Sequence, residues 1–340
     1  MTQTLRWGIL STGNIARQFA DGVAQARRGV VHAVGSRSAE SAAAFAQPRG
    51  IPHALGSYDE LIDHPDINAV YIGLPNSMHH EWAIRALRAG KHVLCEKPLA
   101  SNAQQAAQMF EEARRADRLL VEAFMYRSHP LTAAWLARIR AGDIGKVRLL
   151  RASFCFFTGK PQGNIRFDAG LHGGALMDVG CYCVNLARLV ANAEPVAVHA
   201  QAVWHESGVD ELTVGSLTFA DGMIASFTCG MRVQADNTAS ICGEGGYIEI
   251  PVPWKPPMTE ARYVIRHATP PRMDGSVKPL LPRAPQQEQT VSAEGSLYGL
   301  EADAFAQAVF GERLPEVSEA DTLSNMRVLD ELRRQIGLRF

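Results

Sequence analysis

The sequence lacks an excess of charge of either sign. Its 340 residues carry 34 Lys and Arg against 35 Asp and Glu, which leaves a formal net charge of −1. Because there is no basic surplus, we expect no nucleic-acid partner, and no block of like charges marks an interaction tail. The composition, 46% hydrophobic and 20% charged, is that of an ordinary soluble globular protein. The length suggests two domains.

The sequence also lacks the features of an exported or membrane protein. Arg6 and Trp7 lead directly into a strand-like run, with no apolar segment of a signal peptide before it. No apolar stretch approaches membrane-spanning length, so we expect a cytoplasmic protein with no membrane partner. The six cysteines lie mostly inside apolar runs, as reduced core thiols do in the cytosol.

The cysteines do not predict a metal site. Cys181-x-Cys183 has the form of half a zinc site, but no second Cys or His pair has zinc-site spacing. Both cysteines are better explained as small residues of a helix. We therefore predict no metal.

The first third of the chain alternates strand and helix signals. Strands are predicted at 5–10, 30–36, 68–74, 91–95 and 119–125, and helices at 14–26, 38–47, 79–90 and 101–118. Strands that alternate with helices of this length predict a parallel, doubly wound sheet.

The pattern changes after about residue 127. A helix is predicted at 130–141, followed by strands at 146–157, 196–204, 212–219, 223–231 and 238–250. Turns such as Ala220-Asp221-Gly222 and Glu244-Gly245-Gly246 separate these strands, which predicts a mainly antiparallel sheet. We interpret the proline-rich stretch 251–285 as a surface excursion, and helices at about 295–311 and 319–336 close the chain.

The stretch GILSTGNIA, residues 8–16, joins the first predicted strand to its helix. A dinucleotide-binding turn needs a small first residue, a glycine where the pyrophosphate passes and a small third residue, and here these are Ser11, Gly13 and Ala16. The helix N-terminus would then hold the phosphates. Ser11 replaces the usual first glycine, and an ordinary strand–turn–helix connection is the alternative. The alternating context favours the nucleotide interpretation.

The end of the second predicted strand indicates which nicotinamide cofactor is used. An NAD site usually has a carboxylate here for the ribose 2′-hydroxyl. This chain has Gly35-Ser36-Arg37-Ser38, and the Arg37 guanidinium suits a 2′-phosphate. We predict NADP rather than NAD; the alternative is a solvated surface arginine.

The stretch GKHVLCEKPLA, residues 90–100, ends an apolar strand in Glu96, Lys97 and Pro98. A doubly wound sheet binds ligands outside the carboxyl ends of its strands, so this acid and base are predicted to face the nicotinamide crevice. A solvated turn is the alternative for Glu96 and Lys97 alone.

The stretch HGGALMDVGCYCVNLARLV, residues 172–190, is a second group of candidates. Asp178 and Tyr182 are spaced i,i+4 and so share one face of a helix, which Asn185 continues. Removing hydride from an alcohol carbon requires a group that takes the hydroxyl proton. We predict that Lys97 favours the phenolate of Tyr182 for this role. The alternative is an Asp that satisfies backbone donors and a Tyr at the edge of the core.

Together these segments resemble the Gfo/Idh/MocA family, the glucose-fructose oxidoreductase and inositol dehydrogenase group. The resemblance covers nearly the whole chain. It is carried by residues 7–16, 35–38, 73–100, 122–130 and 173–185, and the string AGKHVLCEKP (89–98) is its most specific part. It implies an α/β protein with an N-terminal Rossmann domain, residues 1–126, and a C-terminal α/β domain, residues 127–340, with a large, mainly antiparallel open sheet.

The resemblance also implies roles for individual residues. In the family the lysine of the EKP motif is catalytic, and the match is Lys97; the peptide bond before that proline, here Pro98, is often cis. Many members carry Asp and then His four residues later. Tyr182 at the second position resembles the branch with dimeric dihydrodiol dehydrogenases, NADP-dependent D-xylose dehydrogenases and glucose-fructose oxidoreductase.

The expected site residues follow from the motifs and the resemblance. The expected catalytic residues are Lys97, Asp178 and Tyr182. The expected cofactor contacts are Ser11, Thr12, Gly13, Asn14, Ile15, Ser36, Arg37, Leu74, Pro75, Asn76, His79, Glu96 and Lys97. The expected substrate contacts are Tyr126, Arg127, Arg166, Asp178 and Tyr182.

The predicted function is an NADP-dependent oxidoreductase that acts on a polyol or sugar, with an aldose oxidised at C1 to a lactone as the leading substrate. Tyr182 transfers the proton, Lys97 supports it and Asp178 orients substrate or lysine. The alternatives are a trans-dihydrodiol dehydrogenase and an NADPH-binding sensor without turnover. The alternating residues 212–219 leave few charges on either face of their strand, so we expect a homodimer through the C-terminal sheet.

Overall fold

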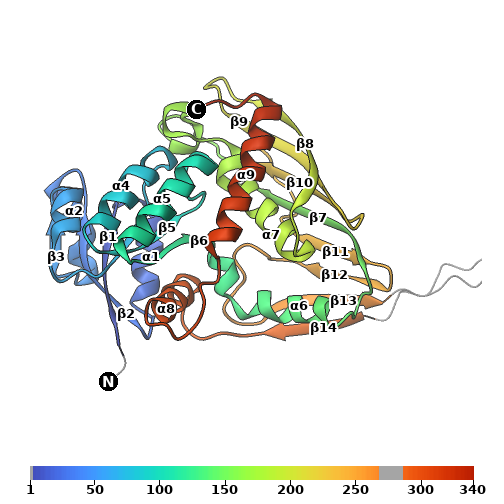
Figure 1. Ribbon diagram of the computed structural model, residues 1–340, viewed down its shortest axis with the longest axis horizontal. Coiled ribbons are helices and arrows are strands. Elements are labelled where there is room, and N and C mark those ends of the chain that lie inside the picture. The colour runs from blue at the N-terminus through green and yellow to red at the C-terminus, as the bar shows by residue number, and fades with distance from the viewer. Residues whose placement is uncertain (1–2, 268–285) are drawn as a thin grey trace, which may run out of the picture.

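Two β-sheets of different construction organise the chain (Figure 1). The structure is a computed structural model that describes residues 3–267 and 286–340. A six-stranded parallel sheet has the order β3-β2-β1-β4-β5-β6, and an eight-stranded sheet has the order β14-β13-β12-β11-β7-β10-β9-β8. The predicted α/β fold class, with a Rossmann-type sheet and a second, mainly antiparallel sheet, is confirmed.

The first sheet and its helices come from the first third of the chain. The strands are β1 (Leu5–Leu10), β2 (Gly29–Gly35), β3 (His53–Leu55), β4 (Ala69–Ile72), β5 (His92–Glu96) and β6 (Leu120–Ala123). The helices are α1 (Asn14–Val23), α2 (Ala39–Ala46), α3 (Tyr58–Asp63), α4 (Asn76–Arg88) and α5 (Ala103–Ala116). β3 and α3 were not predicted, because three strand residues and six helix residues are too few to show a period.

The strand order places a binding crevice at the centre of this sheet. β1 pairs in parallel with β2 on one side and β4 on the other, so the order reverses between β1 and β4. In an open α/β sheet, ligands bind outside the carboxyl ends of the strands at such a reversal. The segments that follow β1, β4 and β5 therefore surround one place.

Helix α8 (Leu297–Val309), near the end of the chain, packs back onto this first sheet. The Trp7 ring on β1 lies 5.2 Å from the ring of Phe19 on α1 and 5.2 Å from that of Phe305 on α8. Asp303 accepts hydrogen bonds from the backbone N–H groups after α1. A helix from near the end of the chain thus packs against the parallel sheet formed by the first third of the chain.

The second sheet comes from the rest of the chain. Its strands are β7 (Val147–Cys155), β8 (Pro195–Trp204), β9 (Asp210–Phe219), β10 (Ile224–Gly230), β11 (Ala239–Gly243), β12 (Gly246–Ile250), β13 (Ala261–His267) and β14 (Gln286–Val291). Among the described strands of the second sheet, only the β10–β7 pair is parallel. The interpretation of 251–285 as an excursion is wrong for 261–267, which forms β13; residues 268–285 lie outside the described residues.

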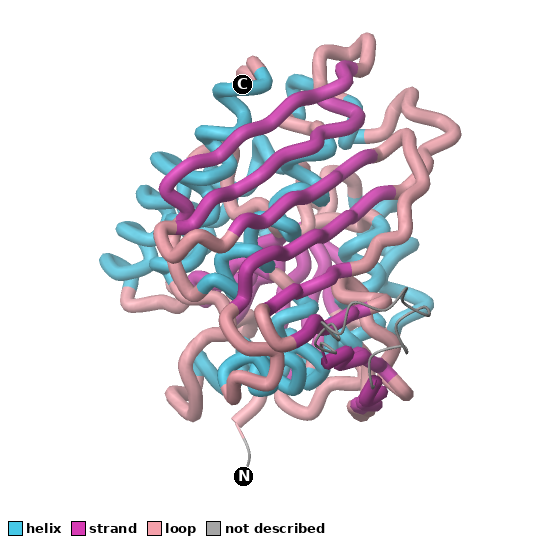
Figure 2. Tube along the Cα trace, turned by 90° about the vertical axis from the view of Figure 1, so that its right-hand side faces the viewer, coloured by secondary structure: helices cyan, strands magenta, loops and turns pink. Residues whose placement is uncertain are grey.

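One face of the second sheet is covered by helices. These are α6 (Pro130–Arg140), α7 (Cys181–Ala191) and α9 (Glu319–Ile336). Figure 2 shows the other face toward the viewer, with the helices behind it. On β9, Thr213, Gly215, Leu217 and Phe219 are buried, whereas Val214 is 49% exposed. Buried and more exposed residues therefore alternate along β9 as expected, and the exposed face of the strand contacts no helix among the described residues.

The helical stretch 169–191, which includes α7, is long and apolar enough to cross a membrane by length and composition. The expectation that no stretch approaches this length is therefore wrong. The most apolar 18 residues of this stretch have a mean hydropathy of 1.3, but 83% of them are buried inside the fold. Burial among strands and helices explains the apolar character as that of a core helix.

Candidate active site

The β1–α1 turn ends in an open helix N-terminus. Ser11 has φ +119°, a region that favours glycine, so its backbone adopts the conformation of the usual first glycine of the motif. Its Oγ accepts the N–H of Gly13 at 3.0 Å, and no side chain caps α1. The first N–H groups of a helix have no partner within it, which makes this end suited to phosphate. Thr12, Asn14 and Ile15 lie on the same turn.

Arg37 extends from the end of β2 into solvent. It is exposed and makes no hydrogen bond or ion pair with any residue of 3–267 or 286–340, whereas Ser36 is buried. Ser38 caps α2 by accepting the N–H of Ser41 at 3.1 Å. The guanidinium of Arg37 is therefore available at the strand end where an adenosine ribose lies in this fold.

His79 and Asn76 on α4 hold neighbouring loops. His79 is fully buried; its Nδ1 lies 3.0 Å from the Pro98 carbonyl oxygen and its Nε2 lies 2.8 Å from that of Leu74. Burial lowers the pKa of His79, whereas the contacts with the two carbonyl oxygens act in the opposite direction. Asn76 donates to the His172 carbonyl at 2.8 Å. His79 ties the ends of β4 and β5 together, next to Pro75.

Lys97 and Asp178 form a partly buried ion pair across the site, with 12% and 14% of their side chains exposed. Lys97 Nζ lies 3.1 Å from Asp178 Oδ1 and donates to the Asp178 carbonyl oxygen at 2.8 Å. The second carboxylate oxygen accepts from Arg166 Nε at 2.6 Å. The Lys97–Pro98 peptide bond is cis, as the resemblance implied. The structure thus brings three predicted site residues together at the carboxyl end of β5.

The charges in this group keep each other ionised. Burial alone raises the pKa of Asp178, but Lys97 and Arg166 outweigh it and lower the pKa to about 2. Burial alone lowers the pKa of Lys97, but attraction to Asp178 outweighs it and raises the pKa. Lys97 is therefore an ammonium, and Asp178 a carboxylate, throughout the neutral pH range.

Glu96 does not face the crevice with its side chain. It is buried, and Oε1 accepts from the hydroxyl of Tyr71, a fully buried residue, at 2.5 Å. Burial raises the pKa of Glu96. The prediction that Glu96 and Lys97 both face the nicotinamide is therefore corrected: the two side chains separate, Glu96 into the core and Lys97 toward Asp178.

Tyr182 lies beside Lys97, but not as predicted. Lys97 Nζ lies 5.2 Å from the centre of the Tyr182 ring, and the hydroxyl contacts Met125 Sδ at 3.2 Å. Burial, and then the charge of Glu96, raise the pKa of Tyr182 well above its usual value. The expectation that Lys97 favours the phenolate is therefore wrong for this arrangement, and Tyr182 is a neutral phenol.

The predicted substrate contacts Tyr126 and Arg127 belong to an internal network. The Tyr126 hydroxyl donates to Asn185 Oδ1 at 2.5 Å, and Arg127 donates to the same oxygen at 3.1 Å. Arg127 also pairs with Asp321 on α9 at 2.9 Å. Because their polar groups bind one another, the geometry does not support a substrate contact for either, whereas 43% of the Arg166 side chain is exposed.

Asp178 sits in a π-turn, Leu176–Gly180, whose position depends on residues that the sequence did not single out. Asp210 is fully buried and accepts the Leu176 N–H at 2.8 Å, and burial raises the pKa of Asp210 to about 6. A Cβ at Gly173 would lie 2.3 Å from the Arg166 carbonyl oxygen, so glycine permits that loop to approach. Short π-helical turns occur frequently at functional sites, but no local pattern marks this one.

The fold and this site define a dinucleotide-dependent oxidoreductase. Residues 5–124 match the oxidoreductase family with an NAD-binding Rossmann fold, and residues 133–249 match the GFO/IDH/MocA C-terminal domain. The trans-1,2-dihydrobenzene-1,2-diol dehydrogenase of Xenopus tropicalis is 33% identical over 98% of this chain and 99% of its own. The D-xylose 1-dehydrogenase (NADP(+)) 2 of Haloferax volcanii is 34% identical over 96% of each.

Solved structures agree with these relatives. A 3-ketoreductase from Actinomadura kijaniata, in complex with NADP and TDP-benzene, superposes with a TM-score of 0.86 at 31% identity over 98% of both chains. An aldose-aldose oxidoreductase from Caulobacter crescentus, complexed with glycerol, superposes with a TM-score of 0.86 at 26% identity over 98% of both chains. The chain belongs to the Gfo/Idh/MocA family and is an NAD(P)-dependent oxidoreductase.

Replacing Asp178 by Asn should show that the charge of Lys97 depends on the Asp178 carboxylate. Without the carboxylate, burial would lower the pKa of Lys97, and the ammonium would be lost as the pH rises. We expect kcat/KM of Asp178→Asn to fall on the alkaline side at a pH at least about one unit below that of the wild type, as initial rates against pH would show.

Arg166→Gln is the matched control. It removes the other cation of Asp178 but leaves the Lys97–Asp178 pair in place. Because the charge of Arg166 lowers the pKa of Lys97, the alkaline limb of this variant should move to higher pH, opposite to the shift in Asp178→Asn. An unchanged alkaline limb in Asp178→Asn would show that Asp178 does not maintain the charge of Lys97.

Proposed function

We propose that the protein transfers hydride between NADP and a polyhydroxylated substrate, with an aldose oxidised at C1 to a lactone as the leading reaction. The observation that carries the proposal is the partly buried Lys97–Asp178 pair beside Tyr182 at the carboxyl end of β5. This group lies at the edge of the sheet that also presents the open N-terminus of α1. The groups proposed to transfer the proton and the helix end proposed to bind phosphate therefore lie at the same edge of the first sheet.

The bound cofactor would accept or supply the hydride. The chain would manage the proton, because a hydroxyl that becomes a carbonyl must lose one. A neutral Tyr182 donates a proton as it stands, which suits carbonyl reduction. Oxidation needs the deprotonated form, so its rate should rise with pH. Lys97 lies close enough to stabilise negative charge that develops during transfer in either direction.

Two substrate classes follow from the relatives. A D-xylose dehydrogenase among them supports an aldose. The ion pair of Arg166 and Asp178 also offers hydrogen-bond partners for several substrate hydroxyls. The dihydrodiol dehydrogenases support a cyclic trans-diol. Of the aromatic rings packed around Tyr182, Phe124, Tyr126 and Trp254 are buried and Phe154 is partly exposed, so these rings do not by themselves favour a cyclic substrate.

The decisive test is a set of initial rates with NADP⁺ and NAD⁺ over aldoses, inositols and trans-dihydrodiols. We expect turnover with an aldose and NADP⁺. Lys97→Met and Tyr182→Phe should each lose about a hundred- to ten-thousandfold in kcat, and the double variant little more, since groups that act as one unit are not additive.

The same measurements judge the alternatives. Turnover only with dihydrodiols would replace the aldose by the second class. Cofactor binding without turnover of any substrate would indicate an NADPH-binding sensor. Losses that multiply in the double variant would mean that Lys97 and Tyr182 work separately.

Arg37 should decide between the two cofactors. A charge-assisted bond to phosphate is worth about 1.5–3 kcal/mol, so Arg37→Ala should weaken NADP⁺ binding about ten- to a hundredfold and leave NAD⁺ binding nearly unchanged. Fluorescence titration of each cofactor measures this. Arg17→Ala, an exposed arginine on α1, is the control. Equal losses for both cofactors in Arg37→Ala would show that it does not contact the 2′-phosphate.

We propose that the enzyme is a homodimer through the open face of the second sheet. Val203, Val214 and Ile224 on this face are 51%, 49% and 46% exposed, and such an apolar surface is typical of an interface. Val214→Arg should halve the molar mass measured by light scattering at micromolar concentration. Leu314→Arg, at an exposed site off the sheet, should leave the mass unchanged. A monomeric wild type would contradict the proposal.

Our proposal also places the protein in the cytoplasm. All six cysteines are free, and five of them are buried. Reduced thiols of this kind are typical of a reducing compartment.

A further inference from the structure

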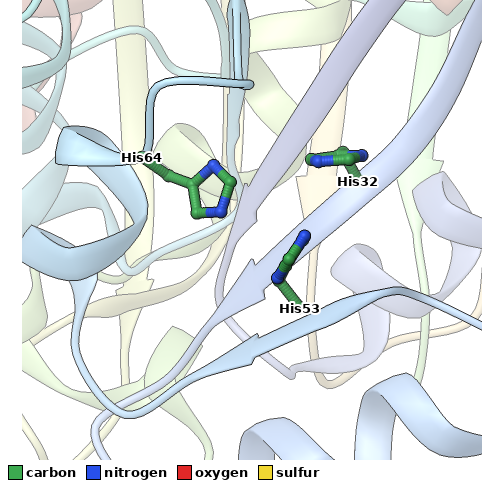
Figure 3. A group of neighbouring side chains, drawn as sticks. All are labelled: His32, His53 and His64. Atoms are coloured by element: carbon green, nitrogen blue, oxygen red, sulfur yellow. The ribbon is translucent and has the colours of Figure 1, made fainter.

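Three histidines converge on the flank of the first sheet (Figure 3). His32 lies on β2, His53 begins β3 and His64 follows α3. One ring nitrogen of each lies within 4.8 Å of the others, and all three side chains are half-buried. The ring centres are 4.6–5.6 Å apart. Segments distant in sequence thus bring three nitrogen donors to one point.

The hydrogen bonds of these rings leave nitrogens without a partner. His32 Nε2 is buried and has no hydrogen-bond partner among the described residues. His64 Nδ1 accepts the Asp66 N–H at 3.3 Å, which leaves Nε2 for another role. A buried polar atom without a partner is costly, so a group that satisfies it is expected.

We propose that His32, His53 and His64 bind a divalent transition-metal ion, with Zn²⁺ as the leading candidate. Imidazole nitrogen is a ligand that Zn²⁺ prefers, with bonds of about 2.0–2.1 Å, so the nitrogens of a tetrahedral site are about 3.3 Å apart. Rotations of the three side chains would bring the nitrogens from within 4.8 Å of one another to this spacing.

The fourth position has a candidate ligand on the same loop. Asp66 Oδ2 lies 4.0 Å from His32 Nε2, and its carboxylate can reach the ion directly or through water. Two cations also lie near: Arg6 bonds to the Asp66 carbonyl, and Lys91 donates to the His64 carbonyl at 2.9 Å. Their charge opposes the metal, so Asp66 is needed to balance it.

The surroundings of His32 suit metal binding. Burial and the neighbouring imidazoles lower the pKa of His32, and a neutral ring is the form that binds metal. The ion would join β2, the three-residue edge strand β3 and the loop after α3. It would therefore act as a structural clamp on this edge of the cofactor-binding sheet.

The test uses the full-length protein with any polyhistidine tag removed, dialysed against a chelator and then titrated with Zn²⁺ against a fluorescent zinc indicator. We expect one equivalent to bind, and the melting temperature to rise by about 5 °C in excess Zn²⁺. Co²⁺ in place of Zn²⁺ should give the visible absorption of a tetrahedral site. No binding by the wild type, or no such Co²⁺ spectrum, would overturn the proposal.

Matched variants locate the ion. His53→Gln and His64→Gln should each weaken Zn²⁺ binding at least about a hundredfold, while retained circular dichroism and NADP⁺ binding show that they fold. His80→Gln on α4 and Cys242→Ser, the one half-buried cysteine, should bind Zn²⁺ like the wild type. Unchanged affinity in both His53→Gln and His64→Gln, or loss in either control, would place the ion elsewhere and refute the site.

Discussion

The pairing of Lys97 with Asp178 is the interaction on which the site depends. Lys97 ends a strand of the first sheet, and Asp178 lies in the π-turn that leads into α7 on the second. Burying either charge alone is unfavourable, and burying both is tolerated because each neutralises the other. The pair therefore requires the two halves of the molecule to meet at one position, and it fixes the ammonium where the strands of the first sheet end.

Several features elsewhere in the fold hold this meeting point. The buried carboxylate of Asp210 receives the first backbone N–H of the π-turn, and the missing side chain of Gly173 admits the loop that carries Arg166. His79 joins the ends of β4 and β5 on the other side. Groups that look like ligands in the sequence, such as His79 and Arg127, are used as scaffold. A charged or polar residue near a site is therefore no evidence of contact with a substrate until its own partners are known.

The neutral state of Tyr182 shows how packing changes a residue's chemistry. An ammonium near a phenol is expected to favour its ionised form. Here the ammonium lies over the ring while the hydroxyl contacts the Met125 sulfur, and burial dominates the pKa. The residue is therefore held in its protonated form.

The sequence alone determined the fold class and the family, and it singled out the β1–α1 turn, Lys97, Asp178 and Tyr182 as candidates, because each rests on a local pattern. Periodic apolar residues mark strands and helices, and a motif is a contiguous string. Only the tertiary structure decided that the Glu96 side chain turns into the core. It also decided that Tyr126 binds Asn185 and that Arg127 pairs with Asp321. The meeting of His32, His53 and His64 is likewise a result of the tertiary structure. These facts depend on the partners that long-range packing supplies, and no spacing along the chain encodes them.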